Sequence, residues 1–194
     1  MDLRPYDRRA LDLAGDVIDQ ITPDRFGRPT PCPPWTVRDL VRHLVSQNLR
    51  FAAAARGEDA DAVCPGDGAD LGADPAAAYR LSAEVVTAAF AVPDIAARTV
   101  VLDELSRPVP APVAIGFHFT DFLVHAWDVA VSIGVPVPVP EELAAAALEV
   151  AERIPDAARG PGAAFGPRVD VASGVSGYDR LLGVAGRDPG WRPS

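Results

Sequence analysis

The most informative stretch for chemistry reads HFTDFLVHAWD, from His118 to Asp128. It holds two of the chain's three histidines, His118 and His125, together with Asp121 and Asp128. An α-helix turns about 100° per residue, so these four side chains share an arc of roughly 80°. The segment lacks the Arg and Glu of an ordinary solvated helix face, and aromatic residues flank it. Because unpaired buried charge is costly, this cluster needs partners.

A divalent metal is the partner that the spacing favours. Asp121 and His125 stand one helical turn apart, so both can reach one ion. The remaining histidine, His43, borders the apolar stripe of an earlier predicted helix and could point into a bundle interior. Two ligands from one helix and one from another leave open positions, which is typical of a catalytic metal site. The alternative is a local Asp–His pair with histidines packed in the core, and spacing alone does not decide between them.

Four further polar residues allow both functional and structural interpretations. His118 is a catalytic candidate as a proton shuttle, or an auxiliary ligand, or a hydrogen-bonded structural histidine. Asp128 is a catalytic candidate that would fix an imidazole tautomer by accepting its hydrogen bond, or a carboxylate on the helix surface. Gln47 and Asn48 follow His43 on the same predicted helix and could contact a cofactor or substrate.

The arginines and cysteines nearby are less specific. Arg42 and Arg50 could hold a substrate carboxylate, but solvated surface arginines are the simpler interpretation. Cys32 and Cys64 do not make a disulfide framework in a chain of 194 residues and lack a CxxC partner. They are either two unrelated thiols or thiols with a role near a site.

Helical periodicity predicts the elements that must position these residues. The four long predicted helices span 6–21, 37–57, 75–92 and 111–133, with Thr36 and Asp39 as a capping box and Gly134 as a C-cap. A fifth helix over 140–154 and a helical turn over 178–184 follow. Residues 58–74 show no periodicity. Residues 98–113 could be a short β excursion or an extended connection. The prolines of 135–140 require an extended chain. The sequence therefore predicts an all-α four-helix bundle with additional short helices and extended loops, as one domain over 1–194.

Composition limits the partners. The net charge is −9, the isoelectric point is about 4.7 and no basic stripe is present, which argues against nucleic acid. No apolar run is long enough to span a membrane, and the charged N-terminus MDLRPYDRR has no signal-peptide core, so we predict a soluble cytoplasmic protein. All 18 basic residues are arginine, which excludes lysine Schiff-base chemistry and the lysine of a phosphate-binding P-loop. A small-molecule substrate fits best, and both monomer and homodimer stay open.

Three segments carry a resemblance to a known family. TPCPPWTVRDLVRHLVSQNLRF (30–51), DFLVHAWDVAVSIG (121–134) and DRLLGVAGRDP (179–189) resemble motifs of actinobacterial DinB-like proteins, the group that includes mycothiol-dependent maleylpyruvate isomerase. The resemblance implies a DinB-like bundle that holds a divalent metal through His43, Asp121 and His125. The acidic position is Asp121, where the isomerase branch typically has Glu, so ion position or affinity is expected to differ. The second domain of that isomerase has no counterpart here, which argues against that particular reaction.

The resemblance also implies a chemistry. Zinc is the default ion, and nickel, iron or manganese also suit imidazole and carboxylate ligands. A low-molecular-weight thiol such as mycothiol would be bound as thiolate and attack a small electrophile, giving a metal-dependent thiol S-transferase or isomerase. The alternatives are a non-catalytic metal- or ligand-binding bundle that acts as a sensor, and a scaffold that works as an interaction protein.

Overall fold

Helices dominate the computed structural model, which describes residues 1–102, 108–156, 159–160 and 165–193. The α-helices are α1 (Arg4–Ile18), α2 (Val37–Arg56), α3 (Ala60–Val63), α4 (Pro75–Phe90), α5 (Ala111–Ile133), α6 (Glu141–Glu152) and α7 (Gly177–Val184). Two 3-10 helices, η1 (Pro23–Arg25) and η2 (Ile95–Ala97), and two strands, β1 (Thr99–Val100) and β2 (Val109–Pro110), complete the described elements.

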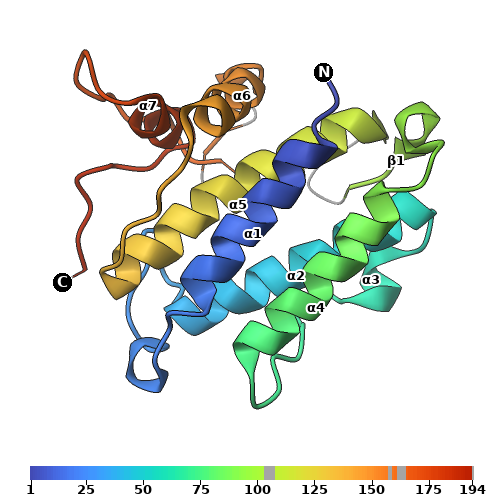
Figure 1. Ribbon diagram of the computed structural model, residues 1–194, viewed down its shortest axis with the longest axis horizontal. Helices are drawn as coiled ribbons and strands as arrows, with labels where there is room; N and C mark the ends of the chain where they lie inside the picture. The colour runs from blue at the N-terminus through green and yellow to red at the C-terminus, as the bar shows by residue number, and fades with distance from the viewer. Residues whose placement is uncertain (103–107, 157–158, 161–164, 194) are drawn as a thin grey trace.

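The four long helices form a bundle (Figure 1). α1 packs along α5 and α2 packs along α4, while α2 also contacts α5. α6 and α7 pack against each other, and α6 also packs on α5 outside the bundle. The predicted all-α, DinB-like class is confirmed, and the four long helices lie within three residues of their predicted bounds.

Local signals explain where the site-bearing helices begin and end. The Thr36 side chain accepts a hydrogen bond from the backbone of Asp39, and the Asp39 side chain accepts one from the backbone of Thr36, which forms the predicted capping box of α2. Gly57 and Gly134 end α2 and α5 in the left-handed conformation, which glycine adopts without steric cost. These signals set where α2 begins and where both helices end.

Two connections differ from or refine the prediction. Residues 60–63 form the short helix α3 inside the loop that showed no periodicity; Asp59 caps it, and four residues are too few to show a periodic pattern. In the ambiguous stretch, β1 pairs antiparallel with β2, with Thr99 opposite Pro110 and Val100 opposite Val109. This is the short β excursion, while residues 103–107 lie outside the described part of the chain.

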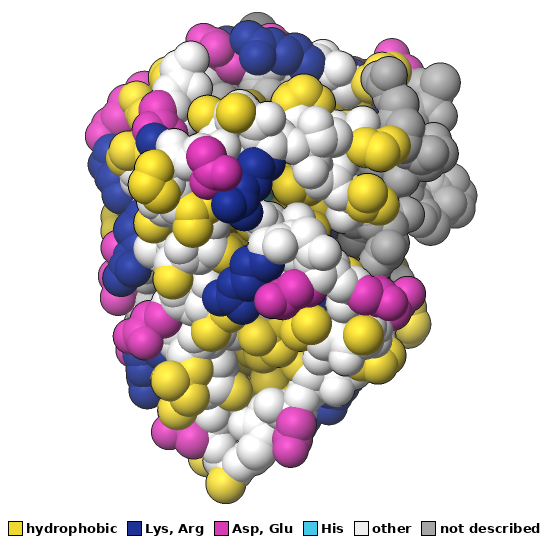
Figure 2. Space-filling view, turned by 90° about the vertical axis from the view of Figure 1, so that its right-hand side faces the viewer, with side chains coloured by type: hydrophobic (Ala, Val, Ile, Leu, Met, Phe, Trp, Pro, Cys, Tyr) yellow, Lys and Arg dark blue, Asp and Glu magenta, His cyan; other side chains and the backbone are white. Residues whose placement is uncertain are grey.

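The core runs through the middle of the bundle, where Leu11, Leu40, Leu44, Phe119 and Phe122 are almost fully buried. Each such side chain contributes about 1.5–3 kcal/mol by leaving water. On the face shown in Figure 2, arginine and acidic side chains are interspersed around hydrophobic ones and do not form a basic stripe. Among the described helices, none combines the length and apolar character needed to cross a bilayer.

Candidate metal centre

The structure brings together the three residues predicted as metal ligands. The Nε2 atom of His125 lies 3.3 Å from Asp121 Oδ1, and the Nε2 atom of His43 lies 4.0 Å from Asp121 Oδ2. The two imidazole rings meet edge to face, with centroids 5.2 Å apart. α5 supplies Asp121 and His125 at adjacent turns, and the second turn of α2 supplies His43.

The spacing of these atoms suits a divalent ion. One ligand atom from each of His43, Asp121 and His125 lies within 4.8 Å of the others. Ligands at about 2.1 Å from a tetrahedral zinc ion sit about 3.4 Å apart, close to the separations of 3.3 and 4.0 Å found here. Asp121 keeps 22% of its side chain exposed and His43 keeps 14%, so the cluster is reachable from solvent. The donor set therefore fits a metal with an open position.

Each of these histidines also has a carboxylate behind it. His43 Nδ1 lies 2.8 Å from Asp67 Oδ1, and His125 Nδ1 lies 2.8 Å from Asp128 Oδ2. When Nδ1 donates to a carboxylate, the lone pair is left on Nε2, which faces Asp121 in both cases. This pair of carboxylate–imidazole contacts presents two Nε2 acceptors to one place.

Asp67 reaches His43 because its loop is fastened to α2. The backbone N–H of Ala69 donates to Ser46 Oγ (3.2 Å), and a turn closes with a hydrogen bond from Gly68 N to Pro65 O (3.0 Å). A Cβ at Gly68 would lie 2.7 Å from Pro65 O, so this turn requires glycine. The loop thereby carries a half-exposed aspartate to the edge of the centre.

The C-terminal segment holds Asp128 in place. Arg187 Nε donates to Asp128 Oδ1 (3.0 Å), and Arg187 Nη2 donates to Oδ2 (3.0 Å), a two-pronged contact inside the protein. Arg187 follows α7 directly after Gly186, which has a φ of +83° and whose Cβ would lie 2.8 Å from Gly166 Cα. Only glycine fits there, so the turn that delivers Arg187 is built into the sequence.

A short proline-rich loop places two more side chains at the centre. Trp35 packs on His43 with ring centroids 4.7 Å apart, and Cys32 Sγ lies 3.3 Å from Asp128 Oδ2. The loop is held by hydrogen bonds from Trp35 N to Cys32 O (2.9 Å) and from Thr30 Oγ1 to Trp35 O (3.0 Å). Cys32 and Cys64 are free thiols, and the buried Cys64 lies away from the centre beside Gly66.

The charges in this cluster support one another. Burial alone would raise the pKa of Asp121, but the adjacent His125 outweighs it and lowers that pKa to about 2. Burial alone would lower the pKa of His125, yet Asp121 raises it well above its usual value. Burial also opposes ionisation of Asp128, and the neighbouring Arg187 nevertheless holds its pKa below the usual value. Asp121 and Asp128 are therefore carboxylates at neutral pH.

A second group of potential ligands shares His125 but suits a cation less well. Atoms of Cys32, His125 and Asp128 also lie within 4.8 Å of one another. However, Arg187 Nη2 lies 3.0 Å from both Cys32 Sγ and Asp128 Oδ2, so a guanidinium charge already occupies that cluster. The cluster around Asp121 contains no such competing cation among the described residues.

His118 and Asn48 are not brought to the centre. His118 is fully buried, with Nδ1 2.6 Å from Asp7 Oδ1 and Nε2 3.1 Å from Asn48 Oδ1. The Asn48 amide also donates to Ser82 Oγ (2.9 Å), so this side chain is occupied in the interior. This position does not support the predicted cofactor contact of Asn48. Gln47 is half-buried one turn beyond His43, where the predicted contact stays a prediction.

The structure separates the two arginines left open by the sequence. Arg42 lies at the surface, paired with Asp39 at 2.9 Å. Arg50 is not the solvated surface residue that we expected, because it is buried and donates to Cys64 O (2.5 Å) and Asp61 Oδ1 (2.8 Å). Arg50 thus ties α3 and its loop to α2.

Asp67 and Arg187 contact the candidate centre but were not predicted from the sequence. Asp67 lies in a loop without periodicity among several other acidic residues, so nothing singles it out. Arg187 lies within DRLLGVAGRDP, which was recognised as a motif without a role for its arginine. The contacts of both residues span distant segments, and only the fold reveals them.

Comparison with known proteins identifies the family of this chain. A family model described as the mycothiol maleylpyruvate isomerase N-terminal domain matches residues 8–130. Two uncharacterized proteins of Mycobacterium tuberculosis, Rv0738 of strain H37Rv and MT0763 of strain CDC 1551, are each 32% identical over 181 residues, which covers 93% of this chain and 94% of theirs.

Solved structures show the same fold. Crystal structures of the mycothiol-dependent maleylpyruvate isomerase and of a mutant superpose with a TM-score of 0.59 at 16% identity. The match covers 76% of this chain and 65% of that protein, so this chain corresponds to about two thirds of the isomerase's length.

Proposed function

The chain belongs to the family of the mycothiol maleylpyruvate isomerase N-terminal domain, and we propose that it is a divalent-metal-dependent enzyme. Its reaction would be the transfer of a low-molecular-weight thiol to a small electrophile, or the thiol-dependent isomerisation of one. Mycothiol is the thiol that the names of the family and of the solved relative suggest. The observation that carries the proposal is the convergence of His43 Nε2 and His125 Nε2 on Asp121, each with a carboxylate behind it.

The proposed ligands are His43, Asp121 and His125, with zinc as the first candidate and nickel, iron or manganese as others. When bound, such an ion would act as a Lewis acid and favour the thiolate form of a coordinated thiol near neutral pH. All three residues offer atoms of the type that these ions prefer, and the separations of those atoms match a shared ion.

The surrounding residues orient this donor set. Asp67 and Asp128 lie at the Nδ1 atoms, so each imidazole in its neutral form donates through Nδ1 and keeps Nε2 free. Arg187 holds Asp128 in place through two hydrogen bonds and keeps it ionised. Trp35 covers one face of the His43 ring and limits access of water from that side. These partners come from the loop before α2, the loop after α3, α5 and the C-terminal segment, so four regions must fold together to complete the centre.

The exposure of the centre favours catalysis over a purely structural ion. A structural zinc site is closed by four protein ligands, whereas a catalytic site keeps a position open. Here the side chains of Asp121 and His43 are 22% and 14% exposed, while His125 is buried behind them. A small thiol and a small substrate could approach Asp121 without opening the core.

The test is metal-dependent consumption of thiol. The full chain, purified without an affinity tag, is stripped with a chelator and reloaded separately with zinc, nickel, iron(II) or manganese(II). Each form is incubated with mycothiol and a panel of small electrophiles that includes maleylpyruvate, and the loss of free thiol and of substrate is followed. We expect turnover in a reloaded form, its loss in the stripped form, and its loss in Asp121→Asn.

Asp70→Asn is the matched control, because Asp70 lies in the loop of Asp67 and its side chain accepts only from the backbone of Gly72 among the described residues. It should keep the parent activity. A chain that binds metal but converts no substrate with any thiol offered would contradict the enzyme proposal and leave a non-catalytic metal-binding bundle.

A further inference from the structure

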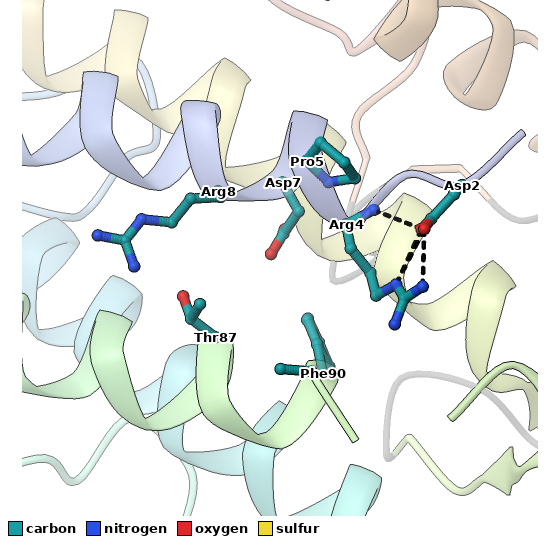
Figure 3. Close-up of a pocket in the computed structure, with 8 residues that line it drawn as sticks. Asp2, Arg4, Pro5, Asp7, Arg8, Thr87 and Phe90 are labelled. Atoms are coloured by element: carbon teal, nitrogen blue, oxygen red, sulfur yellow. Dashed lines mark hydrogen bonds and ion pairs between the residues drawn. The ribbon is translucent and has the colours of Figure 1, made fainter. Parts of the chain in front are cut away.

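A cavity lies between the first two turns of α1 and the last turn of α4 (Figure 3). Its volume is about 380 Å³, within the range of small-molecule sites. The lining includes Pro5, Asp7 and Arg8 from α1 and Thr87 and Phe90 from α4, and none of these belongs to the candidate metal centre. Asp7 contacts His118, which precedes His125 by seven residues, so the two sites are separated by about 10 Å along α5.

Two polar groups of this cavity are incompletely used. The Asp7 side chain is only 3% exposed, and among the described residues just one of its carboxyl oxygens, Oδ1, has a hydrogen bond, to His118. Thr87 Oγ1 is buried and has no hydrogen-bond partner in the described part of the chain. Figure 3 shows the two side chains directed toward each other across the cavity. Buried polar groups are almost always hydrogen-bonded. The Thr87 hydroxyl and the second carboxyl oxygen of Asp7 therefore indicate a place for a ligand group that donates hydrogen bonds.

The rim of the cavity is positively charged and exposed, whereas Asp7 and the Thr87 hydroxyl are buried. Arg4 and Arg8 line it with side chains that are 38% and 52% exposed. Their present partners are the exposed Asp2 and Asp12, and such surface ion pairs are weak. Both guanidinium groups can therefore turn toward an anion at little cost. Pro5 on α1 and Phe90 on α4 add apolar surface on opposite sides of the cavity.

We propose that this cavity binds a small zwitterion of the amino-acid class. Its ammonium group donates to Asp7 and Thr87, its carboxylate lies at Arg4 and Arg8, and its aliphatic part packs on Phe90. A purely structural role accounts for the contact between Asp7 and His118. It does not account for the buried Thr87 hydroxyl, which has no hydrogen-bond partner among the described residues and faces the same carboxyl group across the cavity.

Binding of γ-aminobutyrate and of L-leucine to the full chain, measured by calorimetry and ligand-observed NMR, tests the proposal. Butylamine and butyrate, which carry only one charge each, are the comparison ligands. We expect at least one of the two zwitterions to bind in the millimolar range or tighter, and both single-charge molecules to bind at least about tenfold more weakly, since each loses one set of charged contacts. Failure of both zwitterions to bind at millimolar concentration would overturn the proposal.

Two variants locate the binding. Thr87→Val removes the hydroxyl while keeping the shape, so it should weaken binding of the zwitterion about threefold to tenfold, the range of one hydrogen bond. It should not lower the melting temperature, because the hydroxyl has no hydrogen-bond partner to lose among the residues that the structure describes. If Thr87 had only a structural role, Thr87→Val would lower the melting temperature and leave the affinity for the zwitterion unchanged.

The rim is tested by Arg4→Gln combined with Arg8→Gln, against Arg9→Gln. Arg9 is the neighbour of Arg8 on α1, but it pairs with Glu142 and does not line the cavity. We expect the double variant to weaken binding at least about tenfold and Arg9→Gln to leave it unchanged. Equal binding by the parent, Thr87→Val and the double variant, or equal loss in Arg9→Gln, would overturn the proposal.

Discussion

His125 and His118 lie two turns apart on the same helix, and their surroundings differ completely. His125 bonds to Asp128 through Nδ1 and turns Nε2 to Asp121 at the edge of the bundle. His118 uses both ring nitrogens, Nδ1 with Asp7 and Nε2 with Asn48, and its ring stacks on Phe122 with centroids 4.2 Å apart. One imidazole has an acceptor left for an ion, and the other has none.

The group that faces Nε2 therefore distinguishes a candidate metal ligand from a structural histidine, since both residues are of the same type. At His118 the amide of Asn48 is itself held by Ser82, so Nε2 meets a fixed partner. At His125 the facing group is a carboxylate shared with His43. The buried network consists of Asp7, Asn48, Ser82 and His118 and joins α1, α2, α4 and α5. The open cluster consists of His43, Asp121 and His125, whose ligand atoms lie close together.

The largest effect is expected in the buried network. His118→Ala leaves Asp7 without its partner in the interior, and breaking a buried ionisable pair typically costs about 3–5 kcal/mol. The free energy of unfolding, measured by urea denaturation, should fall by that amount, while the folded fraction keeps its metal. Loss of metal from folded His118→Ala would contradict the division between the two histidines.

The next effect concerns the residue behind His125. Asp128→Asn weakens the orientation of the imidazole, and loss of such an outer partner usually costs about tenfold to a hundredfold in metal affinity. Competition with a coloured chelator measures it. Cys32→Ser serves as the control, since it alters the other neighbour of Asp128 without removing the carboxylate. Unchanged affinity in Asp128→Asn would show that the contact has no role in the centre.

A pH titration distinguishes the metal-free from the metal-bound state of His43, Asp121 and His125. The pKa of His125 is raised above its unfolded value, so its stabilising contribution in the metal-free protein is fully present below about pH 6.5 and is lost as pH rises through the raised pKa. Metal needs the neutral imidazole, so metal affinity should instead rise about tenfold per pH unit while His125 is protonated. Asp121, with a pKa of about 2, does not titrate in this range.

Thermal melts and metal competition over the same pH series measure the two trends. His125→Gln should remove both of them. Metal affinity that is independent of pH up to the raised pKa of His125 would contradict its assignment as a ligand.

The smallest effect is expected at Asp67. Its side chain is 42% exposed, so solvent screens the contact with His43 and partly replaces it. Asp67→Asn should lower metal affinity by about threefold to tenfold, at or below the lower end of the usual range for such partners. Asp70→Asn, in the same loop, should leave it unchanged, and an equal loss in both variants would point to loop disruption instead.

Local sequence signals predicted most of the fold, because they act within a few residues. Thr36, Asp39 and Gly57 define the two ends of α2, and Gly134 ends α5, so these bounds follow from local sequence. The grouping of His43 with Asp121 and His125 followed from helical spacing and from the family resemblance together.

Long-range contacts could not be predicted in this way. Arg187 reaches Asp128 across 59 residues, and Asp67 reaches His43 from a loop without periodicity. Asn48 was expected near the cofactor because it lies on the same helix as His43, but a helix turns about 100° per residue, so its side chain points in another direction. In the folded protein it faces His118 instead.

The metal content of three histidine variants, compared with that of the parent, tests whether His43 and His125 bind a divalent ion. Inductively coupled plasma mass spectrometry on untagged, folded protein gives the number of ions per chain. We predict close to one divalent ion in the parent and in His118→Gln, and none in His43→Ala or His125→Ala. A parent that contains no metal and takes up no added zinc, or a metal content that survives both alanine substitutions, would contradict the assignment of His43, Asp121 and His125 as the metal centre.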